Sequence, residues 1–561
     1  MRVSAAWVSL SFILFISPFQ ECLAEEYHML DTEEAFTVGQ GNIQTEIESG
    51  ITKQPDASEL YNLPRIRLTY GLSEWADLEF DYEYLVVRDT DFVEFEKEKT
   101  NIGHDDQGTG DLRIKLKVTP YEFDSHRMGF QFITKLPNAD QGKGLGTNET
   151  DFTLLFLLSS NWGRLKTHLN AGFATLEDPS RNGNQNDFFV WGVGGEYALT
   201  DSLTVMGEIE GSTAADNGST GFVENIAENS EGNARARVRL ALTGPIGKWR
   251  WGISGFKGVN SHTEDWGAQL GMSRTWDIGG PTEVSTPARS DAVPADSYFN
   301  PLKTEEAYTI GERNFHTEVV LGYVNQPDDS DLYIVPDLTA GWGIGPWADL
   351  QLEFQYLKVE DSIRFGDNGT VVESDVDEHG IGDIRLKFKA SPFACKYGRA
   401  GVHFVTKVPS AEDKDGLGTD EPDFVAKALF STDWAQLFGD SPLGRLRTHL
   451  NAGIAIQGDP HELATQDDYM VWGLAAEYDI TRALVLWTEV EGSTHGKKSV
   501  NISEGDFGNA YGEARLGLTG PLPDFAFLHD WTWGLTASTG LNNHSRDWSA
   551  TVGLSHTWGL R

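Results

Sequence analysis

Charged side chains recur at every second position in several segments of this chain, and that spacing limits the chemistry they could do. One segment alternates acidic with apolar residues, and a later one alternates basic with apolar residues. The members are Asp77, Glu79, Asp81 and Glu83, then Arg113, Lys115 and Lys117. Successive side chains of a strand point to opposite faces, so each charged set shares one face. Rows of opposite sign on neighbouring strands can form cross-strand ion pairs.

The same arrangement returns further along the chain. The further sets are Glu208 and Glu210 with Arg235, Arg237 and Arg239; Glu353 with Arg385, Lys387 and Lys389; and Glu489 and Glu491 with Arg515. Two interpretations stay open. The rows could set up a transverse field that selects solutes along a polar channel. Alternatively, they could neutralise one another and hold the wall together.

Two histidines are candidates for a catalytic base. His168 has the strand parity of Lys166, and His449 has the parity of Arg447, so both are expected on the charged face. A hydrolase needs a nucleophile beside such a base. No serine or acid occupies a neighbouring inward position on the same strand. We therefore expect hydrogen-bonding wall residues, no enzyme, and no catalytic, cofactor or metal-ligand set.

Acidic clusters in the predicted loops could bind divalent cations weakly. They are Asp105 with Asp106, and Asp375 with Asp377 and Glu378. Calcium prefers such oxygen ligands, but this spacing is not diagnostic.

The elements that carry these residues occur twice. The pattern from Phe36 to Trp162 returns from Tyr308 to Trp434 at a constant offset, with Gly110-Asp111 falling on Gly382-Asp383. Beyond that the offset shifts by a few residues, as loop-length changes would cause. A repeat of about 240 residues is too long for a solenoid and fits two copies of one domain.

The segment boundaries follow from composition. Residues 1–24 read as a secretory signal peptide, with Arg2, an apolar stretch to Phe19, and Ala24 before an acidic pair. Residues 25–276 form the first module, the proline-bearing stretch 277–304 a linker, and 305–561 the second module.

Each module shows twelve period-two segments of roughly ten residues, the first predicted near 36–52, and this length suits a tilted strand crossing a bilayer. Connections alternate between short and long. Ser73 to Trp75 is a tight turn, whereas 86–109 and 212–232 are long. Loop length sorted by parity is typical of an antiparallel up-and-down transmembrane β-barrel, whereas a soluble sandwich has no reason to show it.

Several motifs resemble a bacterial outer-membrane family named for the meta pathway of phenol degradation. They are Gly110-Asp111, the run Phe132 to Pro137, Gly144 to Thr147 with Asp151, and Asn170 to Gly172, each with a counterpart in the second module. The resemblance implies barrels of roughly twelve strands and passive uptake of a small, aromatic or hydrophobic solute. The duplication departs from the single module usual in that family.

Twenty-four strands could close as two 12-stranded barrels or as one 24-stranded barrel. We expect two tandem barrels. Both modules end in similar strands, at Trp276 and Trp558, and the linker is long. A single wide ring would need a plug. Only about ten residues separate the signal site from the first predicted strand, so we expect no plug. Tryptophans near strand ends, such as Trp75 and Trp347, are expected in interfacial girdles.

Function follows from these elements. A formal charge of -41 disfavours nucleic acid as a partner. The partners expected are outer-membrane lipid and a small-molecule solute. We predict an outer-membrane channel or transporter for passive solute uptake in the bacterial cell outer membrane. The alternative is a structural or adhesive barrel whose acidic surface loops bind cations.

Overall fold

The protein is described from a computed structural model. It covers residues 27–55, 57–94, 99–146, 150–176, 186–213, 234–278, 299–300, 302–326, 330–365, 371–395, 398–411, 417–418, 422–439, 441–457, 467–481, 483–494, 510–522, 530–543 and 545–559. The predicted signal peptide and most of the predicted linker lie outside these residues. No helix among them is long and apolar enough to cross a membrane.

Among the described residues of the first module, the regular elements are antiparallel strands and one short 3-10 helix, η2. Its elements are β1 Asn42–Lys53, β2 Glu59–Ser73, β3 Ala76–Glu94, β4 Lys99–Thr109, β5 Leu112–Phe123, β6 His126–Leu136, η2 Gln141–Lys143, β7 Asp151–Asn161, β8 Leu165–Leu176, β9 Asn186–Thr200, β10 Leu203–Ser212, β11 Arg235–Ile246, β12 Trp249–Gly258 and β13 Trp266–Asp277.

The second module repeats this order and adds two short helical turns. Its elements are β14 Asn314–Asn325, β15 Asp331–Gly345, β16 Ala348–Phe365, β17 Val371–Ile381, β18 Ile384–Cys395, β19 Gly398–Val408, β20 Asp423–Asp433, α1 Ala435–Phe438, η5 Pro442–Arg445, β21 Leu446–Gln457, β22 Asp467–Thr481, β23 Leu484–Ser493, β24 Gly512–Pro521, β25 Thr532–Gly540 and β26 Trp548–Gly559.

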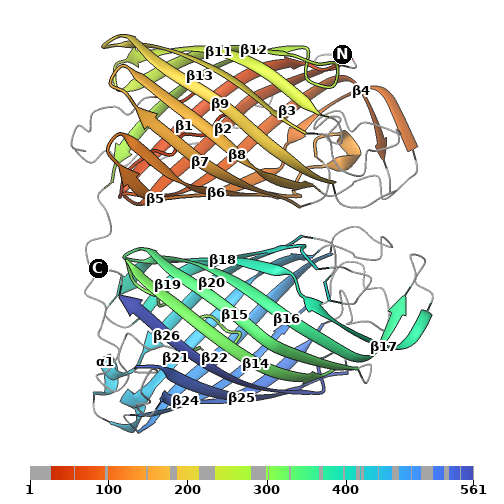
Figure 1. The fold of residues 1–561 in the computed structure, drawn as a ribbon, viewed down its shortest axis with the longest axis vertical. Helices are drawn as coiled ribbons and strands as arrows, with labels where there is room; N and C mark the ends of the chain where they lie inside the picture. Colours follow the sequence, from red (N-terminus) through yellow and green to blue (C-terminus); the bar gives the residue numbers. More distant parts are fainter. Residues whose placement is uncertain are drawn as a thin grey trace, which may run out of the picture.

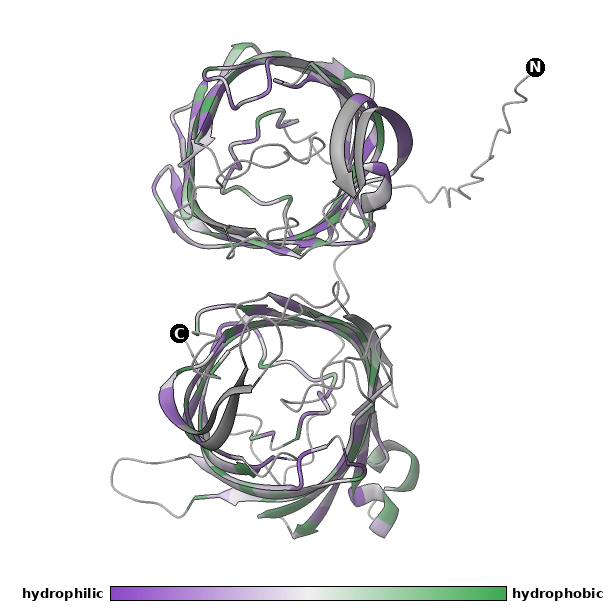
Figure 2. Cartoon of the chain, turned by 90° about the vertical axis from the view of Figure 1, so that its right-hand side faces the viewer, coloured by the Kyte–Doolittle hydropathy of each residue, from purple (hydrophilic) through white to green (hydrophobic). Residues whose placement is uncertain are grey.

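Each module closes on itself. β1 pairs with β13 along its whole length, and β14 pairs likewise with β26. The result is two rings, each of which encloses its own lumen (Figure 2). Two tandem barrels are therefore confirmed, and the 24-stranded alternative is wrong.

Each sheet counts thirteen strands because one strand of the wall is interrupted. β3 pairs with β5 through Ala76–Asp81 and continues past it to pair with β4. β4 and β5 together make one wall strand, broken at Gly110 and Asp111. The barrel is thus 12-stranded. The stretch 86–109, expected as a loop, is mostly a β-hairpin that extends beyond the wall, and β17 repeats it in the second barrel (Figure 1).

The distribution of side chains is inverted relative to a soluble protein. Large apolar groups face outward, with Leu240 67% and Phe173 66% exposed. Charged groups of the same strands are buried inside, with Asp81 and Arg239 each 1% exposed. A charge on the lipid face at mid-bilayer costs about 2 to 4 kcal/mol, so this orientation is the one a membrane imposes. Neither sheet is stacked against a second sheet as in a sandwich.

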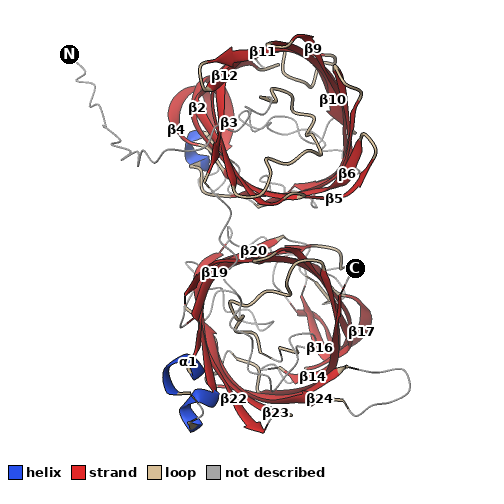
Figure 3. Ribbon diagram, turned by 90° about the vertical axis from the view of Figure 1, so that its left-hand side faces the viewer, coloured by secondary structure: helices blue, strands red, loops and turns tan. Residues whose placement is uncertain are grey.

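A stretch of chain runs inside each barrel. Residues 27–41 precede β1 and residues 299–300 and 302–313 precede β14, and we call them the luminal segments (Figure 3). Tyr27 and Ala35 are fully buried, and Phe299 is 2% exposed. The expectation that no plug exists is wrong. Phe36, expected at the start of the first strand, lies in this segment.

Inward-facing glycines make room for the luminal segments. A Cβ on Gly71 would lie 1.8 Å from the carbonyl oxygen of Gly39, and one on Gly343 would lie 1.7 Å from that of Gly311. A side chain cannot fit at such a distance, so glycine is required at both positions. Both segments therefore make the same close backbone contact with the wall just before the first strand begins. The two modules therefore share the path of the segment as well as the barrel.

The two barrels lie side by side with β4 and β17 projecting from the same end (Figure 1). Their contact is reciprocal. Trp75 packs on Trp342 at 5.6 Å between ring centroids, and Tyr70 packs on Trp347 at 5.7 Å. Equivalent positions thus exchange partners, as across a two-fold axis. Trp347 is only 6% exposed in this interface, so its expected place in an interfacial girdle is wrong.

Candidate solute pathway in the barrel lumen

The charged rows of the first barrel meet across neighbouring strands. Glu79 lies opposite Lys115 in the β3–β5 register, and their charged atoms are 3.0 Å apart. Glu208 lies opposite Arg239 in the β10–β11 register, 2.9 Å apart, and Glu210 is bonded to Arg237. Side chains that lie directly opposite one another on neighbouring strands can pair without adopting an extended conformation, so these ion pairs link the two strands at low entropic cost.

The second barrel repeats this pairing. Glu353 binds Arg385 at 2.8 Å and also contacts Lys387. Arg515 binds Glu489 at 3.2 Å and lies 4.0 Å from Glu491. Since every one of these groups is inside the barrel, the ladders line the lumen walls and also tie them together.

Some predicted residues bind elsewhere than in the rows. Arg113 reaches diagonally to Glu83 at 3.1 Å, while Asp81 is held by Arg65 on β2, which the sequence analysis did not single out. Arg235 pairs at 2.5 Å with Glu264 in the β12–β13 connection. Arg65 also lies on the inward face of its strand, but it belongs to a stretch of mixed residues rather than to a long row of like charges, so the pattern did not indicate it.

The luminal segments use the remaining predicted groups as anchors. The backbone N–H of Val38 donates to Asp77 at 3.1 Å, and Lys117 donates to the Phe36 carbonyl at 3.3 Å. In the second barrel Lys389 binds Glu305 at 3.4 Å. These wall residues therefore hold a polypeptide inside the lumen, a role that no strand pattern indicates.

Backbone anchors recur at matching positions in both barrels. The N–H of Thr32 donates to Glu208 at 2.7 Å, and the N–H of Thr304 donates to Glu489. The amides of Asn170 and Asn451 each exchange two hydrogen bonds with a glutamate backbone of the segment, at 2.6 to 2.8 Å. A signal was available, because Thr32 to Ala35 reads TEEA and returns at residues 304–307.

Ion pairs set the charge of the segment. Burial opposes ionisation of Glu33, but Lys115 at 2.9 Å outweighs it and lowers the pKa of Glu33 to about 2. Burial likewise opposes ionisation of Glu305, yet His403 and Lys389 lower its pKa to about 2. Both carboxylates are therefore charged at neutral pH and attract the basic rows.

The histidines lie in polar clusters that bridge strands. Ser159 on β7 lies 2.8 Å from Nδ1 of His168, and Glu196 on β9 lies 3.3 Å from its Nε2. These serine and glutamate partners come from adjacent strands, which a search along one strand cannot find. Ser159 is fully buried and accepts a hydrogen bond from the Ala35 N–H at 2.7 Å. The hydroxyl thus has no face open to a substrate while the segment is in place.

A cavity of about 320 Å³ lies between the first luminal segment and the wall, toward the ends of β10 and β11 that carry long connections. Asp31 and Thr32 line it from the segment. Leu155 and Val190 contribute apolar surface, and Arg237 contributes charge. A pocket of mixed character suits a small solute that has both an apolar body and a polar group.

The acidic loop clusters have protein partners where they are described. Oδ1 of Asp105 accepts from the Asp89 N–H at 2.9 Å, and Asp106 lies 3.3 Å from His104. The Asp375 side chain lies outside the described residues. Cation binding at these loops stays a prediction.

Comparison with known proteins gives fold likeness only. No protein-family model matches the chain, and no curated protein matches its sequence. An outer membrane channel from Pseudomonas putida F1 aligns with 45% of this chain and 100% of its own at 14% identity and a TM-score of 0.33. The NanC porin aligns with 41% and 98% at 9% identity and a TM-score of 0.30. The outer membrane protein OpdK of Pseudomonas aeruginosa aligns with 92% and 98% at 8% identity and a TM-score of 0.20.

These scores are low, so the assignment of class depends on this chain's own architecture. Each described wall strand pairs with two neighbours in a closed ring, and large apolar side chains face outward. The protein therefore has the architecture of an outer-membrane β-barrel, with two barrels in one chain.

Proposed function

We propose that this protein is a non-enzymatic outer-membrane channel for passive uptake of small solutes, with two parallel pathways, each restricted by its own luminal segment. The finer part of the proposal, an aromatic or hydrophobic solute, draws on the resemblance to the meta-pathway family and on the mixed cavity above Asp31. The observation that carries the proposal is the luminal segment itself. It is bonded to charged groups all around a lumen that side chains alone do not fill.

Hydrogen bonds to wall side chains support a restricting segment that can move. Thr32 and Ala35 are held by Glu208 and Ser159 rather than by strand pairing. Such anchors can be released one at a time, whereas a strand would have to leave the sheet cooperatively. Each barrel has its own set, so the two pathways should open independently.

Planar bilayers test the proposal. The intact protein should show small or intermittent currents. Deleting residues 27–35 should add one steady conductance level, deleting residues 299–307 should add another, and both deletions together should add two. Heat-modifiable migration on gels controls for folding. Silent bilayers from the correctly folded double deletion would rule the channel out and favour the adhesive barrel.

A milder pair of variants avoids deletion. Glu208→Gln and Glu489→Gln each weaken the anchor of one segment and keep the side-chain volume. Each should raise the open probability of one pathway only. Solute specificity is then measured by liposome swelling with matched aromatic and sugar solutes, where the proposal expects faster entry of the aromatic one.

A further inference from the structure

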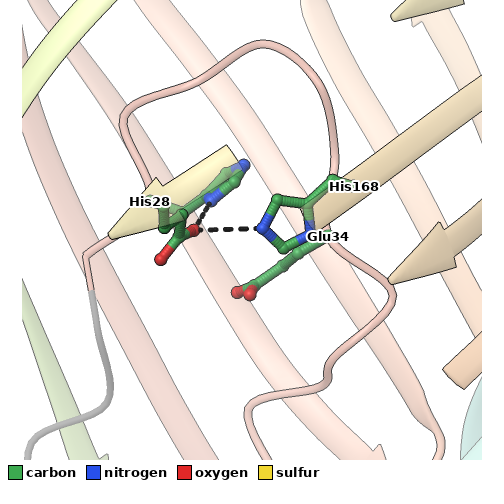
Figure 4. Close-up of side chains that lie close together, drawn as sticks. His28, Glu34 and His168 are labelled. Carbon is green, nitrogen blue, oxygen red and sulfur yellow. Dashed lines mark hydrogen bonds and ion pairs between the residues drawn. The ribbon is translucent and has the colours of Figure 1, made fainter. Parts of the chain in front are cut away.

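Four metal-ligating side chains gather in the first lumen, where the segment crosses β8 and β9. His28 and Glu34 come from the luminal segment, and His168 comes from the wall (Figure 4). Glu196 on the neighbouring wall strand, β9, is the fourth. One ligand atom from each lies within 4.8 Å of the other three. His168 and Glu196 are each 2% exposed. No metal-ligand set was expected from the sequence, in which these four positions are far apart.

Both imidazoles are already oriented by a second partner. Nε2 of His28 lies 2.6 Å from the Thr32 carbonyl oxygen, which can only accept, so Nε2 carries the proton and Nδ1 faces Glu196. Nδ1 of His168 lies 2.8 Å from the Ser159 hydroxyl, so its Nε2 faces Glu196. Histidines that bind metals in proteins have such an outer partner on the other nitrogen.

Two buried polar atoms in this cluster are poorly satisfied within the described chain. Oε2 of Glu196 has no hydrogen-bond partner, and Nε2 of His168 lies 3.3 Å from Oε1 of Glu196 without hydrogen-bond geometry. A buried polar atom without a partner costs about 1 to 3 kcal/mol. Both atoms belong to groups that face one another, so a single cation between them would satisfy both.

The second barrel gathers three equivalent groups, Glu306, His449 and Glu477, and places an arginine beside them. Its glutamate, Glu477, receives a hydrogen bond from Arg447 at 2.8 Å and lies 2.9 Å from Nε2 of His449. Asn300 stands where the first barrel has His28. One copy thus brings a guanidinium to the wall glutamate. The other has a lysine at that position, Lys166, which lies 5.6 Å from the Phe36 ring centroid.

We propose that His28, Glu34, His168 and Glu196 bind one divalent transition metal ion of the zinc type in the first barrel. Two imidazole nitrogens and two carboxylate oxygens match the four-coordinate preference of Zn²⁺. Nδ1 of His28 is now 2.6 Å from Oε1 of Glu196, so these groups must separate by less than about 1 Å to admit metal–ligand bonds of about 2.0 to 2.2 Å. The ion ties the segment to the wall.

Titration calorimetry of Zn²⁺ into the untagged, chelator-treated mature protein tests this. One ion per chain is expected. His28→Asn copies the second barrel and should weaken binding at least about 100-fold. The matched control, His449→Asn, alters the equivalent cluster of the second barrel and should leave affinity within about two-fold. Ser159→Ala, which removes an outer partner, should weaken binding about ten-fold.

A gain of function guards against misfolding of the loss variants. Asn300→His combined with Arg447→Lys rebuilds the first cluster in the second barrel and should raise the stoichiometry from one ion to two. Co²⁺ loaded into the unaltered protein should give the intense visible absorption of a four-coordinate site. Absence of binding by the folded protein would overturn the proposal. So would His28→Asn with unchanged affinity, or His449→Asn with equal loss.

Discussion

The two lumens share one set of backbone anchors but differ in their charges. In the first, Asp31 on the segment binds Arg237 and Arg239 on β11. In the second, Lys303 occupies the position of Asp31, and its ammonium lies 3.3 Å from Glu513. Glu513 occupies the position of Arg237, because it pairs with Glu491 in the same register in which Arg237 pairs with Glu210. The acidic partner lies on the segment in the first barrel and on the wall in the second. The duplicated barrel therefore fixes where the segment runs, while the charges that hold it are exchangeable in matched pairs.

The same contrast appears at the histidine clusters. Glu477 is paired with Arg447, a permanent cation, whereas Glu196 is paired with His28. A histidine can exchange its proton for a metal, and an arginine cannot. The first lumen is thus adapted for an exchangeable cation and the second for a fixed one.

Reversing one charge of the segment should give the largest loss of stability. Asp31→Lys places an ammonium beside Arg237 and Arg239 and is expected to destabilise the first barrel by about 3 to 5 kcal/mol, the range for breaking a buried ion pair. Asp31→Lys with Arg237→Glu copies the second barrel and should restore most of this. Urea midpoints in detergent provide the measurement. A double variant no better than the single one would show that the charges are not interchangeable.

Removing the fixed cation should have the next effect. Arg447→Met leaves Glu477 and Asp479 buried without their guanidinium, at an expected cost of about 3 kcal/mol. Lys166→Met removes the lysine that stands at this position in the first barrel, where it faces the Phe36 ring, and should cost less than Arg447→Met. The same urea experiment compares the two. Equal losses would contradict the distinction between a fixed and an exchangeable cation.

Acid should act on both lumens alike. Glu33 and Glu305 have pKa values lowered from 4.5 to about 2, so their ionised forms stabilise the segments above pH 4.5, and this is lost as pH falls toward 2. Each charged contact is worth about 1.5 to 3 kcal/mol. Bilayer current of the intact protein should therefore rise as the pH falls from 4.5 toward 2, in steps that come from two pathways.

Lys115→Met sharpens the acid experiment. It removes the cation that Glu33 shares with Glu79 in the first barrel and leaves Glu305 unchanged, so the pathway of the first barrel should open at a higher pH than that of the second. Lys389→Met should do the reverse. A current that is independent of pH, in protein that stays folded, would separate the segments from conduction.

The smallest effect on stability is expected at the contact between barrels. The hydroxyls of Thr134 and Thr406 lie 3.2 Å apart, so the double variant Thr134→Cys and Thr406→Cys should form a disulfide on oxidation. After cleavage at a protease site inserted next to Pro287, the barrels should stay joined until a reductant is added. Either single variant is the control. Stability should change by less than about 1 kcal/mol, since one side-chain hydrogen bond is lost. Separation without reductant would contradict the side-by-side contact.

Much of the fold was predictable because a membrane barrel imposes a strict period. A single charge on the lipid face is costly, so an alternating row such as Asp77 to Glu83 indicates which side of the strand faces the lumen. The register that sets Glu79 opposite Lys115 follows from the same rule. The luminal segments obey no period, because irregular chain inside a lumen is held by individual hydrogen bonds. Their sequence signal was the repeat, which begins with TEEA and continues to Gly39 and Gly311, but a repeat does not show that the segment lies inside a lumen.

The chain's own sequence determined the duplication, the strand count of each barrel, the inward direction of the ladders and the closure into two rings. These depend on local alternation and on a repeat, both of which can be read along one dimension. Only the tertiary structure decided that each lumen contains its own preceding segment, and that His28 meets His168 and Glu196. Those contacts join residues on separate strands and on a nonperiodic segment, and only the closed barrel brings them within bonding distance.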